Sequence, residues 1–240
     1  MPSGAIKTRA LLVSCDNQAI ESLCDCAQQI GTQVEICADS MSATRKLCHA
    51  KFEAVILDLA VGPYAVELIT KVHGMTSHKK AVVFAICEGE EQRKAAFQNG
   101  ATLILEKSSS PRAMLRTFRA AYPMMLAERR RYFRYPIEIA VFVKRGPSSE
   151  VKARTINLSE AGMAITSPEP LSPGEHIELR FCLPGTTDFL AFPAQVCWTN
   201  SEGQAGVQFP TVADSAKRQL QNWLAARFEE CTPAPVGTGI

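Results

Sequence analysis

The chain has 240 residues, of which 46% are hydrophobic and 21% are charged, and its formal net charge at pH 7 is +2. This length is long for one compact domain and sufficient for two. The composition argues against a disordered chain, and no apolar run approaches the ~20 residues needed to cross a bilayer. Because the first residues contain no apolar signal core, we expect a cytoplasmic protein without a membrane span.

The nine cysteines and four histidines do not indicate a disulfide framework or a metal site. The cysteine count is odd, most members lie on predicted apolar faces, and no CxxC pair occurs. None of the histidines has the spacing of a partner ligand. Neither half contains a nucleophile–base pair, so we expect no cofactor, no metal and no enzymatic activity.

Residues 1–126 alternate short apolar runs with amphipathic segments. Continuous apolar strands separated by helices are typical of a parallel sheet that is covered on both faces. We therefore expect a doubly wound α/β domain with a five-stranded parallel sheet, in which Ser40 caps the second helix. The expected strands are 10–13, 34–37, 54–58, 81–86 and 102–105, and the expected helices lie near 20–30, 40–47, 65–72, 90–98 and from 111 through 121 or beyond.

The pattern changes at residues 128–136, after which short alternating strands follow one another without helices. Such a pattern is typical of an antiparallel barrel or sandwich. We expect a second domain over residues 127–231, which ends in an amphipathic helix, and a disordered tail over residues 232–240. The expected strands are 137–143, 152–156, 163–166, 176–181, 189–198 and 206–209, and the apolar stripe of the helix is Leu220, Trp223, Leu224 and Phe228.

Two short motifs in this second half carry recognition chemistry. Arg130 and Arg134 lie four residues apart where a helix gives way to a strand, because Pro136 forces extended backbone before it. Further on, the segment from Asn157 to Gly162 joins two strands. Its short polar side chains suit hydrogen bonds in a turn, and its glycine permits a positive φ or a close approach.

Taken together, Arg130-x-x-x-Arg134 and Asn157-x-Ser159-x-x-Gly162 resemble the signature of the PilZ domain, RxxxR followed by [DN]xSxxG. The resemblance covers about residues 128–230, and Trp198 late in a strand and the closing strand 206–209 fit it. It implies a six-stranded barrel that binds cyclic di-GMP. The expected ligand-binding residues are Arg129, Arg130, Arg134, Asn157, Ser159 and Gly162.

The chemistry of these residue types agrees with that implication. An arginine can present a bidentate fork to guanine O6 and N7 and can stack its flat face on the base. Alone, the arginine run fits a solvated helix end, or a nucleic-acid patch with Tyr132 and Phe133 as stacking groups. The small net charge argues against the nucleic-acid reading, and residues 157–162 alone also fit a plain hairpin turn. A PilZ-like fold that no longer binds a ligand remains an alternative.

Residues 8–123 resemble a response-regulator receiver domain in architecture, in Asp58 at the end of the third strand and in Lys107 after the fifth. The resemblance implies an aspartate that accepts a phosphoryl group, with Mg²⁺ held by an acidic pair at the end of the first strand. Here that pair is Ser14-Cys15, and a thiol is a poor ligand for Mg²⁺. The nearest carboxylate, Asp16, comes one position late.

Other receiver features are also replaced. The hydroxyl position after the fourth strand is expected at Ala85, the aromatic position in the fifth strand is Ile104, and Ser108 stands where the family usually has proline. We therefore expect a degenerate receiver, in which Asp58 and Lys107 form an ion pair as the remnant of a phosphoacceptor site. By fold analogy, such a domain serves as a docking or dimerisation surface.

The sequence thus predicts a non-enzymatic adaptor, in which a degenerate receiver precedes a cyclic di-GMP receptor. Because the arginines lie at the joint between the domains, ligand capture would change the interdomain arrangement and the binding of a protein partner. The alternatives are a nucleotide-insensitive protein–protein scaffold and a response regulator that is phosphorylated on Asp58. We expect no nucleic-acid partner; a homodimer, the identity of the partner and the number of ligand molecules per site stay open.

Overall fold

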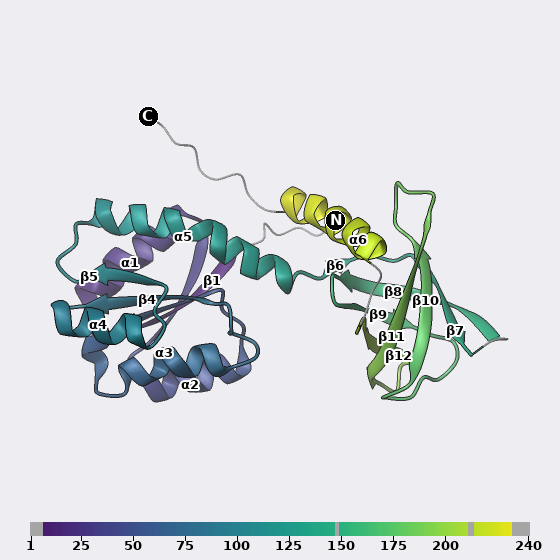
Figure 1. Cartoon of the computed structure of the whole chain (residues 1–240), viewed down its shortest axis with the longest axis horizontal. Helices are drawn as coiled ribbons and strands as arrows, with labels where there is room; N and C mark the ends of the chain where they lie inside the picture. The colour runs from purple at the N-terminus through teal and green to yellow at the C-terminus, as the bar shows by residue number, and fades with distance from the viewer. Residues whose placement is uncertain (1–6, 147–148, 211–213, 232–240) are drawn as a thin grey trace. The chain divides into compact units, whose positions relative to one another are not determined.

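The computed structural model describes residues 7–146, 149–210 and 214–231, which form two compact units (Figure 1). The α/β unit comprises residues 7–130 and the barrel unit comprises residues 131–231. The division therefore falls after Arg130, a few residues beyond the expected boundary. The expected disordered tail, residues 232–240, lies outside the described residues.

The α/β unit contains one five-stranded sheet in the order β2-β1-β3-β4-β5, and every neighbouring pair is parallel. This order is one of the two common doubly wound arrangements, so the predicted fold class is confirmed. The strands are β1 Thr8–Val13, β2 Thr32–Cys37, β3 Ala54–Asp58, β4 Val82–Cys87 and β5 Leu103–Glu106. The helices are α1 Asn17–Gln29, α2 Ser40–His49, the 3-10 helix η1 Leu59–Val61, α3 Ala65–Gly74, α4 Glu90–Gln98 and α5 Pro111–Arg131.

Helices cover both faces of this sheet (Figure 1). On one face, α1 and α5 bury a cluster that includes Leu12 and Phe84 from the strands. On the other face, α2, α3 and α4 cover a cluster that includes Leu11 and Val55. Burial on both faces explains why the strands are continuous apolar runs in the sequence.

The cap of α2 differs from the expectation, and the end of α5, which the sequence left open, is defined. Asp39, and not Ser40, is the N-cap of α2, because its side chain accepts a hydrogen bond from the backbone N–H of Ser42 at 2.8 Å. Helix α5 continues through Pro123 to Arg131. Met125 and Glu128 are both buried, so tertiary packing maintains the helix beyond the proline that breaks its local pattern.

The barrel unit is a closed antiparallel barrel. Its strands follow the order β6-β8-β7-β10-β11-β12-β9, and an additional pairing between β8 and β9 closes β7 to β12 into a ring of six. The predicted six-stranded barrel with a C-terminal helix is thus confirmed. The elements are β6 Tyr135–Pro136, β7 Ala140–Arg145, β8 Ser149–Ser159, β9 Gly162–Thr166, β10 His176–Cys182, β11 Phe189–Thr199, β12 Gln204–Gln208 and α6 Asp214–Cys231.

The barrel core alternates with the outer face along each strand. Leu158, Leu179 and Phe192 are fully buried, and α6 adds Leu220 and Leu224 to the same cluster. Since successive strand residues point to opposite faces, the intervening positions of the same strands lie on the outside of the barrel. Among the described residues of both units, no helix combines the length and apolar character that a membrane span requires.

Candidate functional site

Arg134 lies on the outer side of an extended segment that connects α5 with β6. Its neighbours point the other way: the ring of Phe133 meets Phe228 edge-on at 5.2 Å, and that of Tyr135 meets Trp223 at 5.5 Å. These two contacts anchor the segment on α6. Because side chains alternate along extended backbone, Arg134 is exposed between its two anchored neighbours.

Asn157 is the direct partner of Arg134. The Nη1 atom of Arg134 donates a hydrogen bond to Oδ1 of Asn157 at 3.1 Å, and Asn157 pairs in register with Pro136 of β6. A hollow of about 480 Å³ lies alongside β6 and β8, and its lining includes Pro136, Ile156 and Arg154. The two polar side chains therefore lie on the outer surface of the barrel, and their sequence neighbours Pro136 and Ile156 line the hollow.

Ser159 and Gly162 shape the hairpin that carries Asn157. The Ser159 side chain is only 4% exposed, and its hydroxyl donates to the carbonyl oxygen of Gly162 at 2.8 Å. Gly162 does not have a positive φ. A Cβ at this position would lie 2.1 Å from the carbonyl oxygen of Val207, so the glycine allows β9 to approach β12. The close approach that the sequence suggested is thus made to the barrel's own backbone.

One cross-strand row links Asn157 to an exposed tryptophan. Asn157 is opposite Ala164, Ala164 is opposite Gly206, and Gly206 is opposite Trp198. Residues directly opposite each other in a sheet share a face. The indole of Trp198 is 46% exposed and covers Gly206, where a Cβ would lie 2.0 Å from its Nε1 atom. An aromatic platform and an amide therefore lie on the same outer surface, on either side of Ala164.

The remaining two arginines of the predicted set lie on the last turn of α5. Arg130 is partly buried there. Arg129 is directed to the α/β unit, where its Nη1 atom lies 3.5 Å from Oε1 of the fully buried Glu53. The structure thus brings Arg134, Asn157, Ser159 and Gly162 together, whereas Arg129 is engaged by a carboxylate that the sequence did not single out.

Asp58 is enclosed at the end of β3. It is 2% exposed; its Oδ2 atom accepts a hydrogen bond from the Ser14 hydroxyl at 2.8 Å, and its Oδ1 atom accepts one from the N–H of Ala60 at 2.9 Å. Ser14 occupies the first position of the pair that is acidic in receivers. A neutral donor therefore satisfies the Asp58 carboxylate where a receiver would have a second carboxylate to share a cation.

The expected ion pair between Asp58 and Lys107 is wrong. Lys107 Nζ lies 3.1 Å from Oδ2 of Asp16 instead. The hydrogen bond from the Ala19 N–H, followed by that from Lys107, lowers the pKa of Asp16, and the hydrogen bond to Asp16 raises the pKa of Lys107. Asp16 is available at this position because it caps α1, and a cavity of about 240 Å³ adjoins the pair.

The expected position of the missing hydroxyl also needs correction. Ala85 lies inside β4, two residues before its end at Cys87. The residue in register with Asp58 is Ile86. Both side chains are apolar, so β4 places no hydroxyl beside Asp58.

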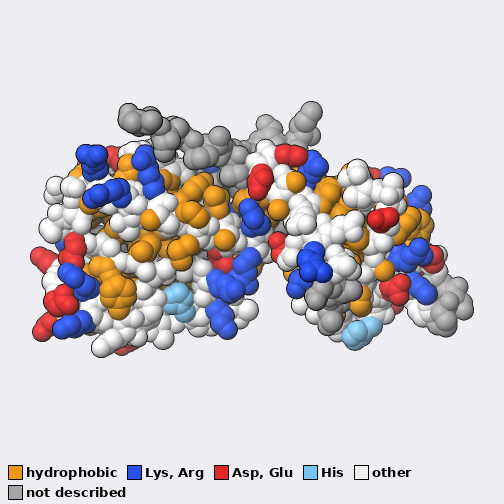
Figure 2. Space-filling view, turned by 45° about the horizontal axis from the view of Figure 1, so that its top comes forward, with side chains coloured by type: hydrophobic (Ala, Val, Ile, Leu, Met, Phe, Trp, Pro, Cys, Tyr) orange, Lys and Arg blue, Asp and Glu red, His pale blue; other side chains and the backbone are white. Residues whose placement is uncertain are grey.

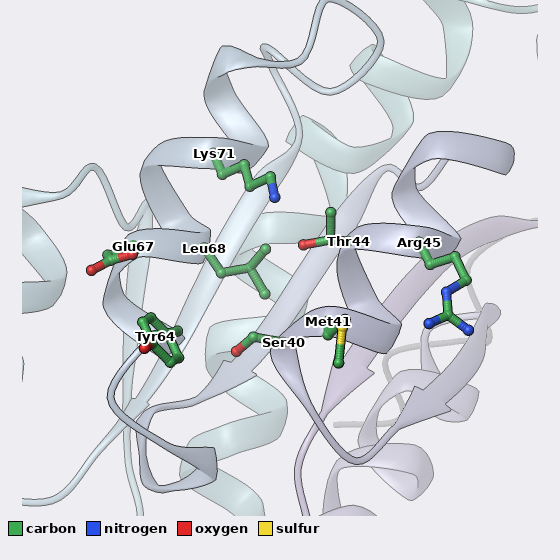
Figure 3. Close-up of a pocket in the computed structure, with 8 residues that line it drawn as sticks. All are labelled: Ser40, Met41, Thr44, Arg45, Tyr64, Glu67, Leu68 and Lys71. Carbon is green, nitrogen blue, oxygen red and sulfur yellow. The ribbon is translucent and has the colours of Figure 1, made fainter.

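A separate groove of about 550 Å³ lies between α2 and α3 (Figure 3). Met41 on α2 and Tyr64 beside α3 are exposed at its mouth, and Leu68 is buried beneath them. Glu67 and Arg45 extend away from each other in Figure 3, so the groove does not gather charged groups at one point. This arrangement differs from the barrel surface, where an arginine and an amide converge.

Charge is distributed over small groups elsewhere. On the face drawn in Figure 2, Lys and Arg side chains stand in small groups among Asp, Glu and apolar side chains on both units. Within residues 7–146, 149–210 and 214–231, no three His, Cys, Asp or Glu side chains are grouped closely enough to hold a metal ion. All nine cysteines are free thiols.

Residues 128–226 match the PilZ domain. The C-terminal part of this chain is a PilZ domain. The match begins inside α5, so the last turn of that helix belongs to the PilZ sequence although it packs within the α/β unit. No curated protein matches the chain.

Solved structures of receiver domains match the N-terminal half. One is the receiver domain of a sensor histidine kinase from Pseudomonas aeruginosa, which is 15% identical over 49% of this chain and 99% of its own, with a TM-score of 0.45. The chemotaxis response regulator CheY4 of Vibrio cholerae is 22% identical over 48% of this chain and 98% of its own, with a TM-score of 0.44. A response regulator from Thermotoga maritima is 14% identical over 49% of this chain and 99% of its own, with a TM-score of 0.44. The strand order β2-β1-β3-β4-β5 of the α/β unit is that of a receiver-like fold.

Two groups beside the PilZ motif were not assigned a role from the sequence. Trp198 was noted only as part of the family context. The signal that could have indicated its role is the pairing of an outward-facing tryptophan with a glycine on the next strand. Glu53 gave no signal, because a single glutamate before a buried strand is indistinguishable from a solvated residue until the packing of α5 is known.

Proposed function

We propose that this chain is a non-enzymatic signalling adaptor whose PilZ domain binds cyclic di-GMP. The observation that carries the proposal is the outer surface of the barrel, where the Arg134–Asn157 pair and the Trp198 ring lie along one cross-strand row. Strands are about 4.8 Å apart, so the three steps from Asn157 to Trp198 span ~14 Å. We propose that a guanine base lies along this row between Asn157 and Trp198.

The chemistry of the row suits guanine. Indole rings stack on nucleobases, a contact worth about 1–3 kcal/mol per base. The guanidinium of Arg134 can donate to O6 and N7 of the same base, and a good bidentate contact discriminates between bases by about 1–3 kcal/mol. The Asn157 amide adds a donor and an acceptor at the base edge. Ser159 and Gly162 support this surface by fixing the hairpin.

The phosphates of the ligand require further positive charge. Arg130, the first arginine of the motif, is the residue we assign to them, since an arginine fork also matches phosphate oxygens. Arg129 can contact the ligand phosphates only if its ion pair with Glu53 breaks. Because the boundary between the two compact units falls directly after Arg130, ligand capture by Arg130 and Arg134 would constrain both sides of that boundary. We propose that this constraint changes the interdomain arrangement and the binding of a protein partner.

Two alternative functions, a response regulator phosphorylated on Asp58 and a nucleotide-insensitive scaffold, predict different experimental outcomes. A regulator phosphorylated on Asp58 is disfavoured by the enclosure of that carboxylate and by its hydrogen bond to Ser14. Treatment with acetyl phosphate or beryllofluoride should leave the protein unchanged by mass and by spectroscopy. A nucleotide-insensitive scaffold would bind its partner equally well with and without ligand.

Isothermal titration of the full chain with cyclic di-GMP tests the proposal directly. We expect saturable binding to the wild type and a loss of at least tenfold in affinity for both Arg134→Ala and Arg134→Lys, because lysine keeps the charge but not the fork. Arg119→Ala, an exposed arginine on α5 outside the motif, is the matched control and should bind like the wild type. Absence of binding to the wild type would refute the proposal.

A further inference from the structure

Two ion pairs hold the end of α5 against the rest of the α/β unit. They involve Glu128 and Arg129, the two residues that directly precede Arg130. Lys51 Nζ lies 2.6 Å from Oε1 of Glu128, and Arg129 Nη1 lies 3.5 Å from Oε1 of Glu53. The two carboxylates are buried, with exposed fractions of 2% and 0%, whereas the two cations are partly exposed. All four residues belong to the α/β unit, so these contacts are internal to it.

Arg129 is the cation paired with Glu53, and Lys51 adds a further positive charge nearby. The Oε2 atom of Glu53 accepts a hydrogen bond from the backbone N–H of Arg9 at 2.7 Å, while its Oε1 atom has no hydrogen-bond partner among the described residues. A buried carboxylate that loses its counter-ion is left with an uncompensated desolvation cost. Burial raises the pKa of Glu53, and the positive charge of Arg129 acts in the opposite direction. The charged form of Glu53 is therefore favoured by the presence of Arg129.

Arg129 can also bind an anion in the same way as Arg130 and Arg134. It is adjacent in sequence to Arg130, its guanidinium carries the same fork, and a phosphate group offers that fork a second anionic partner. At 3.5 Å the contact with Glu53 is longer than a good charge-assisted hydrogen bond, so an exposed phosphate can compete with it. One guanidinium cannot serve both anions in its present position.

We propose that Glu53 competes with the ligand phosphates for Arg129, so that a buried residue of the α/β unit limits the ligand affinity of the PilZ domain. This inference rests on the proposed function, and it assigns to the α/β unit a specific action on the arginine motif. In the ligand-bound protein Arg129 exchanges the Glu53 carboxylate for a phosphate. The position of Glu53 before β3 thus makes it a positioning residue for Arg129, not a ligand contact.

A double-mutant cycle on the full chain tests the competition. Isothermal titration with cyclic di-GMP would compare the wild type, Glu53→Gln, Arg129→Ala and the double variant at one fixed salt concentration. Glu53→Gln retains the acceptor for Arg9 and removes the charge, so we expect about tenfold tighter binding, equivalent to ~1.4 kcal/mol. Arg129→Ala should bind no more tightly than the wild type, and Glu53→Gln should have no further effect in its background.

Glu35→Gln is the matched control. Glu35 is a glutamate of the same unit that pairs with Arg9 and Lys46 away from α5, so its variant changes the net charge equally and should leave the affinity unchanged. If Glu53→Gln did not fold, Glu53→Met would replace it, because an apolar chain of similar length suits a buried site. Thermal unfolding of each variant identifies the folded ones.

The outcomes separate this inference from the function on which it rests. Equal or weaker binding by a folded Glu53 variant would overturn the competition while the cyclic di-GMP receptor stands. If Glu53→Gln still increased the ligand affinity in the Arg129→Ala background, the competition would be overturned as well, because the increase would then not depend on Arg129. If no variant bound cyclic di-GMP, the proposed function and the competition would both be wrong.

Discussion

At the scale of single residues, the hairpin between β8 and β9 depends on Gly162, whose structural role is not evident from the sequence. A Cβ at position 162 would lie 2.1 Å from the carbonyl oxygen of Val207 and 3.1 Å from the Cα of Gln208. These contacts are backbone atoms of β12, which cannot rotate away as a side chain could. The space at Gly162 is therefore set by the closure of the barrel.

We predict that Gly162→Ala lowers the stability of the PilZ domain by about 1–3 kcal/mol, the usual cost of overpacking, and weakens ligand binding with it. Chemical denaturation followed by tryptophan fluorescence measures the change, since both tryptophans lie in this domain. Ser159→Ala, which loses one hydrogen bond but adds no atom, should cost only about 1 kcal/mol. Equal stability of Gly162→Ala and the wild type would show that β9 and β12 can separate freely.

At the scale of elements, the row across β8, β9, β12 and β11 is where we propose that a base stacks. We predict that Trp198→Ala weakens cyclic di-GMP binding by about ten- to a hundredfold, the loss expected for one stacked base. Gly206→Ala should have a similar direction of effect, because its methyl group would displace the indole. In a Trp223→Phe background, quenching of Trp198 fluorescence by the ligand reports the contact directly, and unchanged fluorescence at saturation would argue against stacking.

The loop before β4 carries a histidine whose neutral form the fold requires. His78 is fully buried; its Nε2 atom accepts a hydrogen bond from the Phe52 N–H at 3.2 Å, and its Nδ1 atom lies 2.9 Å from the Ser77 hydroxyl. Burial, with a further contribution from the charge of Lys51, lowers the pKa of His78 to about 4. The unfolded chain therefore binds a proton at a higher pH than the folded chain, so stability falls as the pH decreases from about 6.5 toward 4.

This linkage predicts that the α/β unit loses about 2 kcal/mol of stability from His78 between pH 7 and pH 5. Scanning calorimetry measures the unfolding transitions of the two units. The transition of the α/β unit is the one that has no counterpart in a tryptophan fluorescence melt, because both tryptophans lie in the barrel unit. His78→Gln, which cannot titrate, should show a shallower dependence over this interval. If both proteins lost the same stability, other groups would have to account for the acid sensitivity.

The sequence predicted these elements well where burial is strong and poorly where partners come from elsewhere. The β3 run Ala54–Asp58 was predicted to the residue, because a fully buried parallel strand is apolar throughout. Helix α5 was predicted through Ala121 or beyond without a defined end, because its continuation to Arg131 depends on the packing of Met125 and Glu128. Of the site, the motif residues were found by their spacing, whereas the partners Glu53, Asp16 and Gly206 depend on contacts between distant segments.

At the scale of the whole molecule, the consequence of ligand capture should be visible in solution scattering. We predict that saturating cyclic di-GMP changes the small-angle X-ray scattering profile of the full chain at constant mass, because ordering between Arg130 and Arg134 restricts the two units. The Arg134→Ala variant should show the same profile with and without ligand. Identical profiles of the wild type in both conditions, with binding confirmed by calorimetry, would refute a change in interdomain arrangement.

The boundary after Arg130 has a consequence for how this receptor can be divided or recombined. By its contacts Arg130 belongs to the α/β unit and Arg134 to the barrel. A truncation that respects the compact units would therefore split the arginine motif and leave a barrel with Arg134 but without Arg130. Any transfer of the receptor to another protein, by gene fusion in the laboratory or by recombination in evolution, has to carry the end of α5 along with the barrel.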